Sequence, residues 1–168
     1  MISVAHGRRV NKGNIIIFTG TEDIPCPKCG GALVVHGTCI RKLRKRYEDQ
    51  TFRLRVMECS VCGRTHRELP DEFVPYKRMD ADLLRIIAEA PRSEQVLVAE
   101  ASTWSRVRVW LRWFLAYAAH VLNAMLEQYT AFATIPSGET ARRRLTYFVR
   151  LVVNSGNWIQ HRSVQTGR

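Results

Sequence analysis

The sequence contains no apolar run long enough to cross a lipid bilayer. Its longest apolar stretch, residues 113–126, is interrupted by His120 and Asn123, whereas a membrane-spanning helix needs about 20 residues. The first 20 residues also lack the shape of a signal peptide, since their longest apolar run is residues 15–18. We therefore expect a protein without membrane association that works in a reducing cytoplasm.

Acidic residues are scarce in this sequence. The 168 residues include 15 Asp and Glu against 26 Lys and Arg, which gives a net charge of +11 at neutral pH. Such an excess of positive charge predicts a polyanionic partner, although charge alone does not distinguish DNA from RNA or from acidic lipid. The length suits one ordinary domain, or a small metal-stabilised module followed by a helical one.

Cysteine is also infrequent, but four of the five cysteines form two copies of a Cys-x-x-Cys-Gly motif separated by 29 residues. A pair of thiolates two residues apart occupies one edge of a metal tetrahedron, and the following glycine allows the chain to turn. The two motifs together predict one closed, structural Zn²⁺ site whose ligands are Cys26, Cys29, Cys59 and Cys62.

Disulfides and a redox centre are the competing interpretations of these cysteines. The odd number of cysteines and the lack of a signal peptide argue against disulfides. A thioredoxin-like Cys-x-x-Cys opens a helix in a βαβ unit and needs no second copy. Cys39, His36 and His66 lie near the motifs, and each is either a further ligand candidate or an ordinary core or surface residue.

The insert between the two motifs has the pattern of a β-hairpin. Residues 32–36 and 39–47 have an extended character, and residues 48–50 suit a turn. In residues 51–57, Phe52, Leu54 and Val56 alternate with Arg53, Arg55 and Met57. A further strand is expected at residues 14–19. Together these elements predict a zinc ribbon, a β-hairpin or three-stranded sheet whose stability comes from the metal.

Seven basic residues gather in this insert with almost no acidic partners. Charge that protects edge strands from aggregation is one explanation, but one or two charges suffice for that purpose. Contact with phosphate groups accounts better for the number. The candidate DNA-binding residues of the insert are Arg41, Lys42, Arg44, Lys45, Arg46, Arg53 and Arg55.

After a connector punctuated by prolines, the sequence has a helical pattern from residue 80 onward. An amphipathic helix is expected at residues 80–89, a second helix from Ser93 to about Ala101, and a third helix that Ser102 caps. This spacing is typical of a helix-turn-helix, in which the second and third helices are joined by a tight turn.

The third helix is long and keeps one apolar seam. The seam residues are Trp104, Val107, Leu111, Phe114, Ala118, Val121 and Met125. Ser105, Arg108 and Arg112 lie away from the seam, so we expect them to contact DNA bases, with Arg106 on the phosphate backbone. A solvated outer face is the alternative for any one of these arginines.

A last helix is expected from its N-cap Ser137 to about Val153, packed against the long helix as an antiparallel hairpin. Positive charge near the start of a helix is unfavourable because it opposes the helix dipole. We therefore expect the arginines at this position, Arg142, Arg143 and Arg144, to be present for binding. The seam of the long helix continues to Tyr129 with heptad spacing and suits a homodimer or a partner protein.

These elements predict an α+β chain of two domains. Residues 1–78 are expected to form the zinc ribbon with its N-terminal strand and connector. Residues 79–168 are expected to form an all-α domain with the helix-turn-helix and the long α-hairpin.

Several motifs have a familiar order: Cys-Pro-x-Cys-Gly-Gly from residue 26, Cys-x-x-Cys-Gly-Arg-x-His from residue 59, Glu-Leu-Pro-Asp from residue 68, and Val-Pro-Tyr-Lys-Arg from residue 74. Their order resembles an uncharacterised bacterial family, domain of unknown function 6431, which occurs around mobile elements. That family is similar to the zinc-ribbon and helix-turn-helix region of insertion-sequence transposases. The resemblance implies DNA binding in a prokaryotic or phage cytoplasm, in association with the nucleoid.

The resemblance spans most of the chain, and one departure concerns base contact. Trp104-Ser-Arg stands where the family pattern has an aliphatic residue followed by two arginines. Recognition of bases by the third helix is therefore expected to differ from that of the family.

Transposase catalysis is not expected of this chain. A DDE nuclease needs three carboxylates on an RNase H-like sheet that hold two metal ions. The acidic residues after Asp82 fall on predicted helices or their caps: Glu89, Glu94, Glu100, Glu127 and Glu139. The leading hypothesis is a non-catalytic protein that binds double-stranded DNA, as a regulator or accessory factor of a mobile element. The alternative is an interaction or dimerisation module without a nucleic-acid target.

Overall fold

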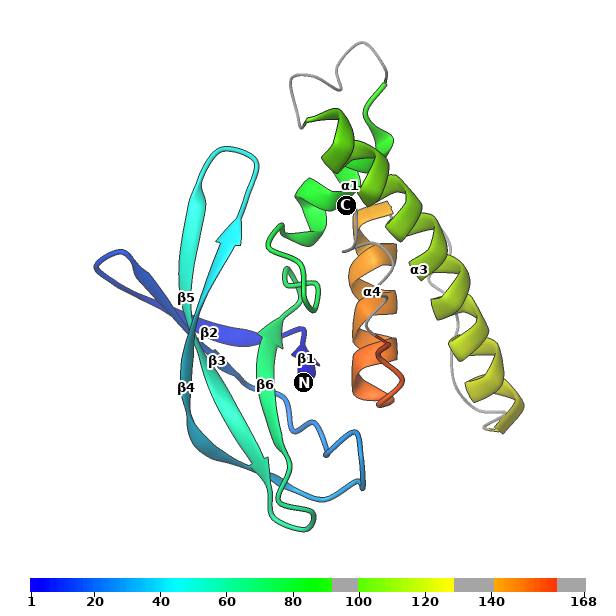
Figure 1. Cartoon of the computed structure of the whole chain (residues 1–168). Helices are drawn as coiled ribbons and strands as arrows, with labels where there is room; N and C mark the ends of the chain where they lie inside the picture. Colours follow the sequence, from blue (N-terminus) through cyan, green and yellow to red (C-terminus); the bar gives the residue numbers. More distant parts are fainter. Residues whose placement is uncertain (92–99, 129–140, 160–168) are drawn as a thin grey trace.

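The computed structural model describes residues 1–91, 100–128 and 141–159, in which a curled six-stranded sheet precedes three helices (Figure 1). The helices lie on one side of the molecule and strands β2 to β5 on the other, with β1 and β6 between them. The expected order of strands first and helices second is therefore confirmed. None of the described helices has the length and apolar character that a bilayer span requires.

Strand β5 is the centre of the sheet. The strands are β1 (Ile2–Val4), β2 (Gly7–Lys12), β3 (Ile15–Gly20), β4 (Leu33–Arg44), β5 (Asp49–Cys59) and β6 (Thr65–Pro70). One edge of β5 pairs with β4 along its whole length, antiparallel, from Leu33 opposite Cys59 to Arg44 opposite Asp49. The other edge is shared, because β3 runs parallel to the first half of β5 and β6 antiparallel to the second half.

The expected hairpin is present, but the sheet around it is larger than the predicted ribbon. The two extended segments at residues 32–36 and 39–47 are one strand, β4, whose register shifts by one residue between Val35 and Gly37. Strands β1, β2 and β6 were not expected. Neither β2 nor β6 alternates apolar with polar residues in the sequence. β2 forms a tight hairpin with β3, which follows it directly, whereas β6 pairs with the preceding β5 and also with the distant β1.

Two hydrophobic cores underlie the strands and the helices. The sheet core consists of Ile2, Val4, Phe18, Leu43, Phe52, Leu54, Met57, Leu69 and Phe73. In it the ring of Phe52 meets the edge of Phe73, with ring centroids 5.0 Å apart. The helical core begins at Val74 and includes residues from all three helices, while Met1 packs against both cores. The division at residues 78 and 79 into two independent domains stays a prediction.

The helices are α1 (Ala81–Glu89), α3 (Ala101–Gln128) and α4 (Ala141–Asn154). Helix α1 begins where it was expected, because the carboxylate of Asp80 accepts a hydrogen bond of 2.7 Å from the backbone N–H of Leu83. The predicted second helix at residues 93–101 lies almost wholly outside the described residues, so the helix-turn-helix stays a prediction.

The apolar faces of the two longer helices were predicted correctly, but their relative direction was not. Val107, Phe114, Ala118 and Val121 of the α3 seam are buried, as are Leu145, Val149 and Val152 of α4. Figure 1 shows α3 and α4 running in the same direction, and Met125 near the end of α3 lines one cavity with Asn154 at the end of α4. The antiparallel hairpin is therefore wrong: an apolar stripe determines which face is buried but not the direction of the helix.

Candidate metal centre and nucleic-acid interface

The four predicted zinc ligands lie together at one end of the β4–β5 ribbon. The Sγ atoms of Cys26, Cys29, Cys59 and Cys62 are all within 4.8 Å of one another. The closest pairs are Cys29 with Cys59, at 3.5 Å, and Cys26 with Cys62, at 3.8 Å. Tetrahedral zinc with Zn–S bonds of about 2.3 Å requires sulfur atoms about 3.8 Å apart. The donor set and its spacing thus fit one closed, structural zinc site.

The two motifs adopt the same turn. In each, the glycine after the second cysteine has a positive φ, 74° for Gly30 and 65° for Gly63. Each glycine N–H donates to the carbonyl of the first cysteine, at 2.8 Å for Gly30 and 3.0 Å for Gly63. The backbone N–H groups of Lys28 and Val61 donate to the sulfurs of Cys26 and Cys59, each over 3.4 Å.

Backbone amides favour the ionised form of Cys59, the first cysteine of the second motif. The N–H of Cys62 contributes most to lowering the pKa of the Cys59 thiol, to about 6. A thiolate is the form that coordinates zinc. The backbone of the second motif therefore prepares the sulfur of Cys59 for a cation.

His66 on β6 is next to the sulfur cluster and is not a fifth member of it. Its Nε2 lies 3.3 Å from the Sγ of Cys26, and its Nδ1 lies 3.1 Å from the amino group of Met1. Burial, followed by the positive charge of the Met1 amine, lowers the pKa of His66. A neutral imidazole that accepts from Met1 at Nδ1 has its proton on Nε2 and donates it to Cys26.

The other two residues left open by the sequence lie apart from the metal site. His36, the extra residue in the β4 irregularity, pairs through Nδ1 with Glu58 at 2.8 Å. Cys39 packs against the sheet core. The motif Cys-x-x-Cys-Gly-Arg-x-His contained the signal for His66, because the histidine follows the second motif on the strand that returns beside it.

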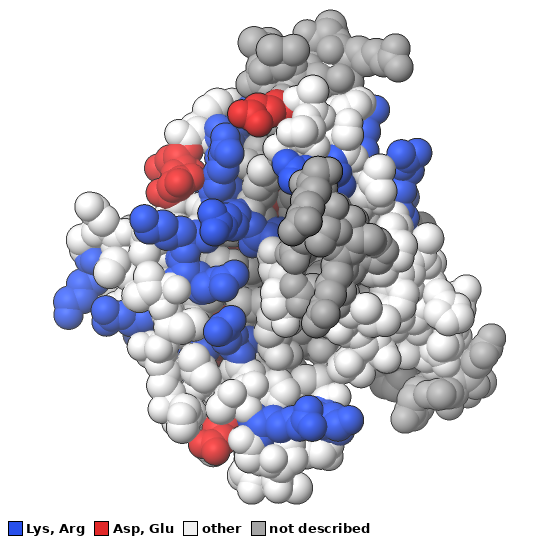
Figure 2. Space-filling model, viewed as in Figure 1, with Lys and Arg blue, Asp and Glu red and all other residues white. Residues whose placement is uncertain are grey.

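One face of the sheet carries positive charge that no carboxylate of the described residues neutralises in an ion pair. Two rows of side chains run across β2, β3, β5 and β4 in register: Lys12, Ile15, Thr51 and Lys42, then Val10, Ile17, Arg53 and Ile40. We call these eight residues the outer sheet face, because the alternate side chains Phe18 and Phe52 point into the core. In the view of Figure 2, Lys and Arg gather over the part of the molecule that the strands occupy, with few acidic groups among them.

The outer sheet face also exposes apolar side chains. Ile40 is 51% exposed and Val10 is 44% exposed, with Ile15 and Ile17 partly covered between them. Lys12, Lys42 and Arg53 are exposed, and no carboxylate of the described residues forms an ion pair with any of them. The face therefore combines cations with a small apolar centre.

Strand alternation separates the seven basic residues of the insert instead of placing them on one face. Lys42, Arg44 and Arg53 are exposed, and Arg46 follows the end of β4 with its guanidinium 5.1 Å from the ring centroid of Tyr47. Lys45 is bound to Glu72 at 2.9 Å. Arg41 is paired in register with the buried Phe52 and lies on the inner side. The expectation of one densely positive hairpin face is therefore only partly met.

The side chain of Arg55 is only 22% exposed and is held by partners within the chain. Its Nε donates to the carboxylate of Glu68 at 2.9 Å, and its Nη2 donates to the carbonyl of Gly20 at 2.9 Å. Glu68 is only 1% exposed and also accepts from the N–H of Gly20 at 3.1 Å. The Arg55–Glu68 pair joins β3, β5 and β6 where the edge of β5 changes partner, so the assignment of Arg55 to DNA contact is corrected.

Arg108 also has a structural position. Its Nε and Nη2 donate to the carbonyls of Ala88 and Ala90, at 2.7 and 3.1 Å, and its guanidinium lies 3.8 Å from the ring centroid of Trp104. These carbonyls are at the C-terminal end of α1, where a cation is favourable. We therefore withdraw Arg108 from the residues expected to contact bases.

The remaining helical candidates are mostly exposed. Ser105, Arg106 and Arg112 lie on the open surface of α3, and Arg144 is exposed on α4. Arg142 and Arg143 belong to the first turn of α4, and their two side chains are not among those that the structure describes. Exposure allows contact with a partner and does not identify it.

Comparison with known families finds a match for the segment that contains the metal motifs. Residues 26–107, just under half of the chain, match the family model described as a domain of unknown function, DUF6431. The matched segment runs from the first cysteine of the metal site to the second turn of α3. Neither a curated protein nor a solved structure matches the chain. The resemblance to this family is thereby supported, whereas the link to transposases stays a prediction.

Proposed function

We propose that this protein is a non-catalytic, zinc-stabilised DNA-binding protein that contacts the phosphate backbone through its outer sheet face. The observation that carries the proposal is the set of exposed cations on that face that have no carboxylate partner among the described residues. Cations in such a position bind phosphates and release condensed counterions, which favours a polyanion. The isoleucines between them supply apolar contact for the sugars.

Zinc has a mechanical role in this proposal. Cys59 ends β5, and Cys26 and Cys29 precede β4, so a metal held by both motifs fixes the base of the β4–β5 ribbon. Four thiolates leave no coordination position for water or substrate. The metal thus holds the strands that present Lys42 and Arg53, and it takes no part in a reaction.

The helices are proposed to add a second area of contact. Ser105 and Arg112 are exposed on α3 and are the remaining candidates for contact with base edges, with Arg144 on a phosphate. In this proposal the target is double-stranded DNA and the protein is a cytoplasmic, nucleoid-associated regulator or accessory factor of a mobile element. The support for that setting is the family resemblance.

Duplex binding at increasing salt concentrations tests the proposal. We expect the wild-type protein to bind labelled duplex DNA with a steep loss of affinity as salt rises. Combined Lys42→Gln and Arg53→Gln substitutions should lower the slope of log K against log salt by about 1.8, because each lost phosphate contact contributes about 0.9. Arg67→Gln, which removes an exposed charge on β6, is the matched control. Absence of duplex binding by the folded, zinc-loaded protein contradicts the proposal.

Selection of the bound duplexes from a random pool tests whether the protein prefers a particular DNA sequence. With zinc present we expect an enriched motif, and after chelation we expect the enrichment to disappear because the ribbon loses its base. If Arg112→Ala binds every selected and unselected sequence equally less well, α3 contacts only the backbone.

The alternative, a dimerisation module built on α3, has less support. The described part of its seam packs within the chain, since Val107, Phe114 and Ala118 are buried against α1 and α4. A seam that is covered by its own domain offers little apolar area to a second copy.

A further inference from the structure

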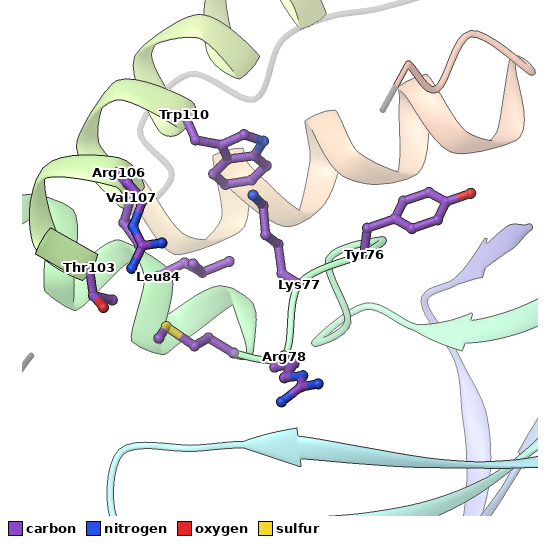
Figure 3. Close-up of a pocket in the computed structure, with 9 residues that line it drawn as sticks. Tyr76, Lys77, Arg78, Leu84, Thr103, Arg106, Val107 and Trp110 are labelled. Carbon is purple, nitrogen blue, oxygen red and sulfur yellow. The ribbon is translucent and has the colours of Figure 1, made fainter. Parts of the chain in front are cut away.

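A cavity of about 240 Å³ opens between helices α1 and α3 and the segment before α1. Its apolar wall is formed by Leu84, Val107 and Trp110. Figure 3 shows Arg106 on the α3 side of this cavity and the side chain of Lys77 rising from the opposite side toward the ring of Trp110. Two cations thus approach one small space from two different segments of the chain.

A second cavity, of about 210 Å³, adjoins the first and shares Met79 and Thr103 with it. It is lined by the end of β4 and the residues that follow, Arg44, Lys45 and Arg46, and by one carboxylate, Glu100. We call the two cavities together the junction cleft, because they lie where the sheet meets the helices. Six basic residues line it: Arg44, Lys45, Arg46, Lys77, Arg78 and Arg106.

Within the described part of the chain, most of this charge has no ion-pair partner. Of the six, Lys45 pairs with Glu72, whereas no carboxylate of the described residues forms an ion pair with Lys77, Arg78 or Arg106. The Nζ of Lys77 lies 4.5 Å from the ring centroid of Trp110, and burial lowers the pKa of Lys77. A half-buried ammonium without an anion is unfavourable, and an anion placed in the cavity would relieve that cost.

The backbone at the rim of the cleft is strained. Tyr76 has a φ of 61°, and no other described residue except glycine has a positive φ. An aromatic residue rarely adopts this conformation, and such strain concentrates at binding sites. The turn is closed by the N–H of Lys77, which donates to the carbonyl of Val74 at 3.0 Å. Its effect is to expose Tyr76 while Lys77 points into the cavity.

We propose that the junction cleft binds a phosphate group between Lys77 and Arg106, with the hydroxyl of Thr103 as a third donor. A phosphate fits better than a carboxylate because it accepts from donors on several sides at once. Resting on the proposed function, we assign this phosphate to the DNA backbone. Free phosphate or a nucleotide has the same chemistry, and an acidic peptide is a different class of partner, so the experiment compares them.

The main test compares Arg106→Gln in the cleft with Arg67→Gln, which removes an exposed charge on β6 outside the proposed contact surfaces. For duplex DNA, we expect Arg106→Gln to reduce the slope of log K against log salt by about 0.9 relative to wild type. Lys77→Gln should reduce it similarly. An unchanged slope in both cleft variants, with both folded as judged by circular dichroism and zinc content, overturns the assignment of the DNA phosphate to this cleft.

A second measurement tests phosphate binding by the cleft independently of DNA binding, which is the proposed function. Inorganic phosphate and a 5′-nucleotide are titrated into wild-type protein and observed by ³¹P NMR, with Arg106→Gln and Arg112→Gln alongside. Binding that disappears only in Arg106→Gln supports the cleft even if the protein binds no DNA, in which case the proposed function fails and the phosphate site stands. Phosphate binding that is equal in all three proteins, or that is absent, overturns the site. Tighter binding of an oligoglutamate peptide that depends on Arg106 overturns it in favour of a protein partner.

Discussion

The guanidinium of Arg55 lies against the carboxylate of Glu68, with the arginine Nε 2.9 Å from Oε2, in the interior of the sheet. Glu68 is 1% exposed, so its charge depends on this one partner and on the N–H of Gly20. The favourable ion pair raises the pKa of Arg55. The pair occupies the point where the edge of β5 passes from β3 to β6, and it therefore connects two halves of the sheet.

Removal of Arg55 is expected to destabilise the sheet. Arg55→Met leaves the buried Glu68 without its cation, and breaking a buried pair in this way reduces the free energy of unfolding by about 3–5 kcal/mol. The double variant with Arg55→Met and Glu68→Leu should recover part of that loss, because no charge then stays buried. Urea unfolding followed by circular dichroism measures both. A single variant as stable as the wild type would show that water reaches Glu68.

Arg108 gives a prediction that separates a structural arginine from an exposed one. Arg108→Ala removes two charge-assisted hydrogen bonds to the end of α1 and should reduce the free energy of unfolding by about 1–3 kcal/mol. Arg112→Ala, four residues along the same helix and exposed, should change it by less than about 0.5 kcal/mol. Equal effects on stability would contradict the capping role that we assign to Arg108.

These two arginines show what the sequence could and could not predict. The four cysteines, the burial of the helix seams and the bounds of the helix at residues 80–89 follow from local spacing, and each lies close to where it was expected. The role of an arginine depends instead on what a distant segment places beside it. Glu68 is 13 residues from Arg55, and Ala88 is 20 residues from Arg108. A helical wheel identifies which face a residue occupies but not the partner opposite that face.

The extent of the sheet was hidden for a different reason. The residues of β2 are all exposed, and its pairing with β3 uses backbone groups that every residue has. The outer sheet face is assembled from four strands, and its rows exist only in the folded register. The sequence therefore indicated many basic residues in one segment, while the fold determines which of them share a surface.

His66 gives a prediction on metal affinity. A hydrogen bond from its Nε2 to the sulfur of Cys26 helps to orient a ligand, and loss of such an outer partner weakens metal binding by about 10–100-fold. His66→Ala should therefore bind one zinc ion per chain with that reduction in affinity, measured by competition with a chromophoric chelator. His36→Ala, which loses only the exposed pair with Glu58, is the control and should be unchanged. If both variants weaken binding alike, the effect is not due to the contact with Cys26.

The raised pKa of the Asp80 carboxyl leads to a prediction on how the stability of the protein depends on pH. Burial is the main cause that raises the pKa of this carboxyl above its ordinary 3.8, partly opposed by the N–H of Leu83. The folded protein then holds the Asp80 proton more tightly than the unfolded chain, so this residue lowers stability as pH rises from about 3.8 through the folded pKa. The loss is complete above the folded pKa and absent well below 3.8.

Asp80→Asn should remove this pH-dependent loss and keep the helix cap, because an asparagine oxygen accepts the same hydrogen bond from Leu83. We expect the variant to be more stable than the wild type at neutral pH, with a difference that shrinks as the pH falls. Asp82→Asn, in the first turn of α1 but partly exposed, is the matched control; it loses an ion pair with Arg85 and should not be more stable than the wild type at neutral pH. Urea unfolding at a series of pH values measures the difference. If Asp80→Asn is less stable at neutral pH, the charge on Asp80 contributes more through the first turn of α1 and the nearby Lys45 than its burial costs.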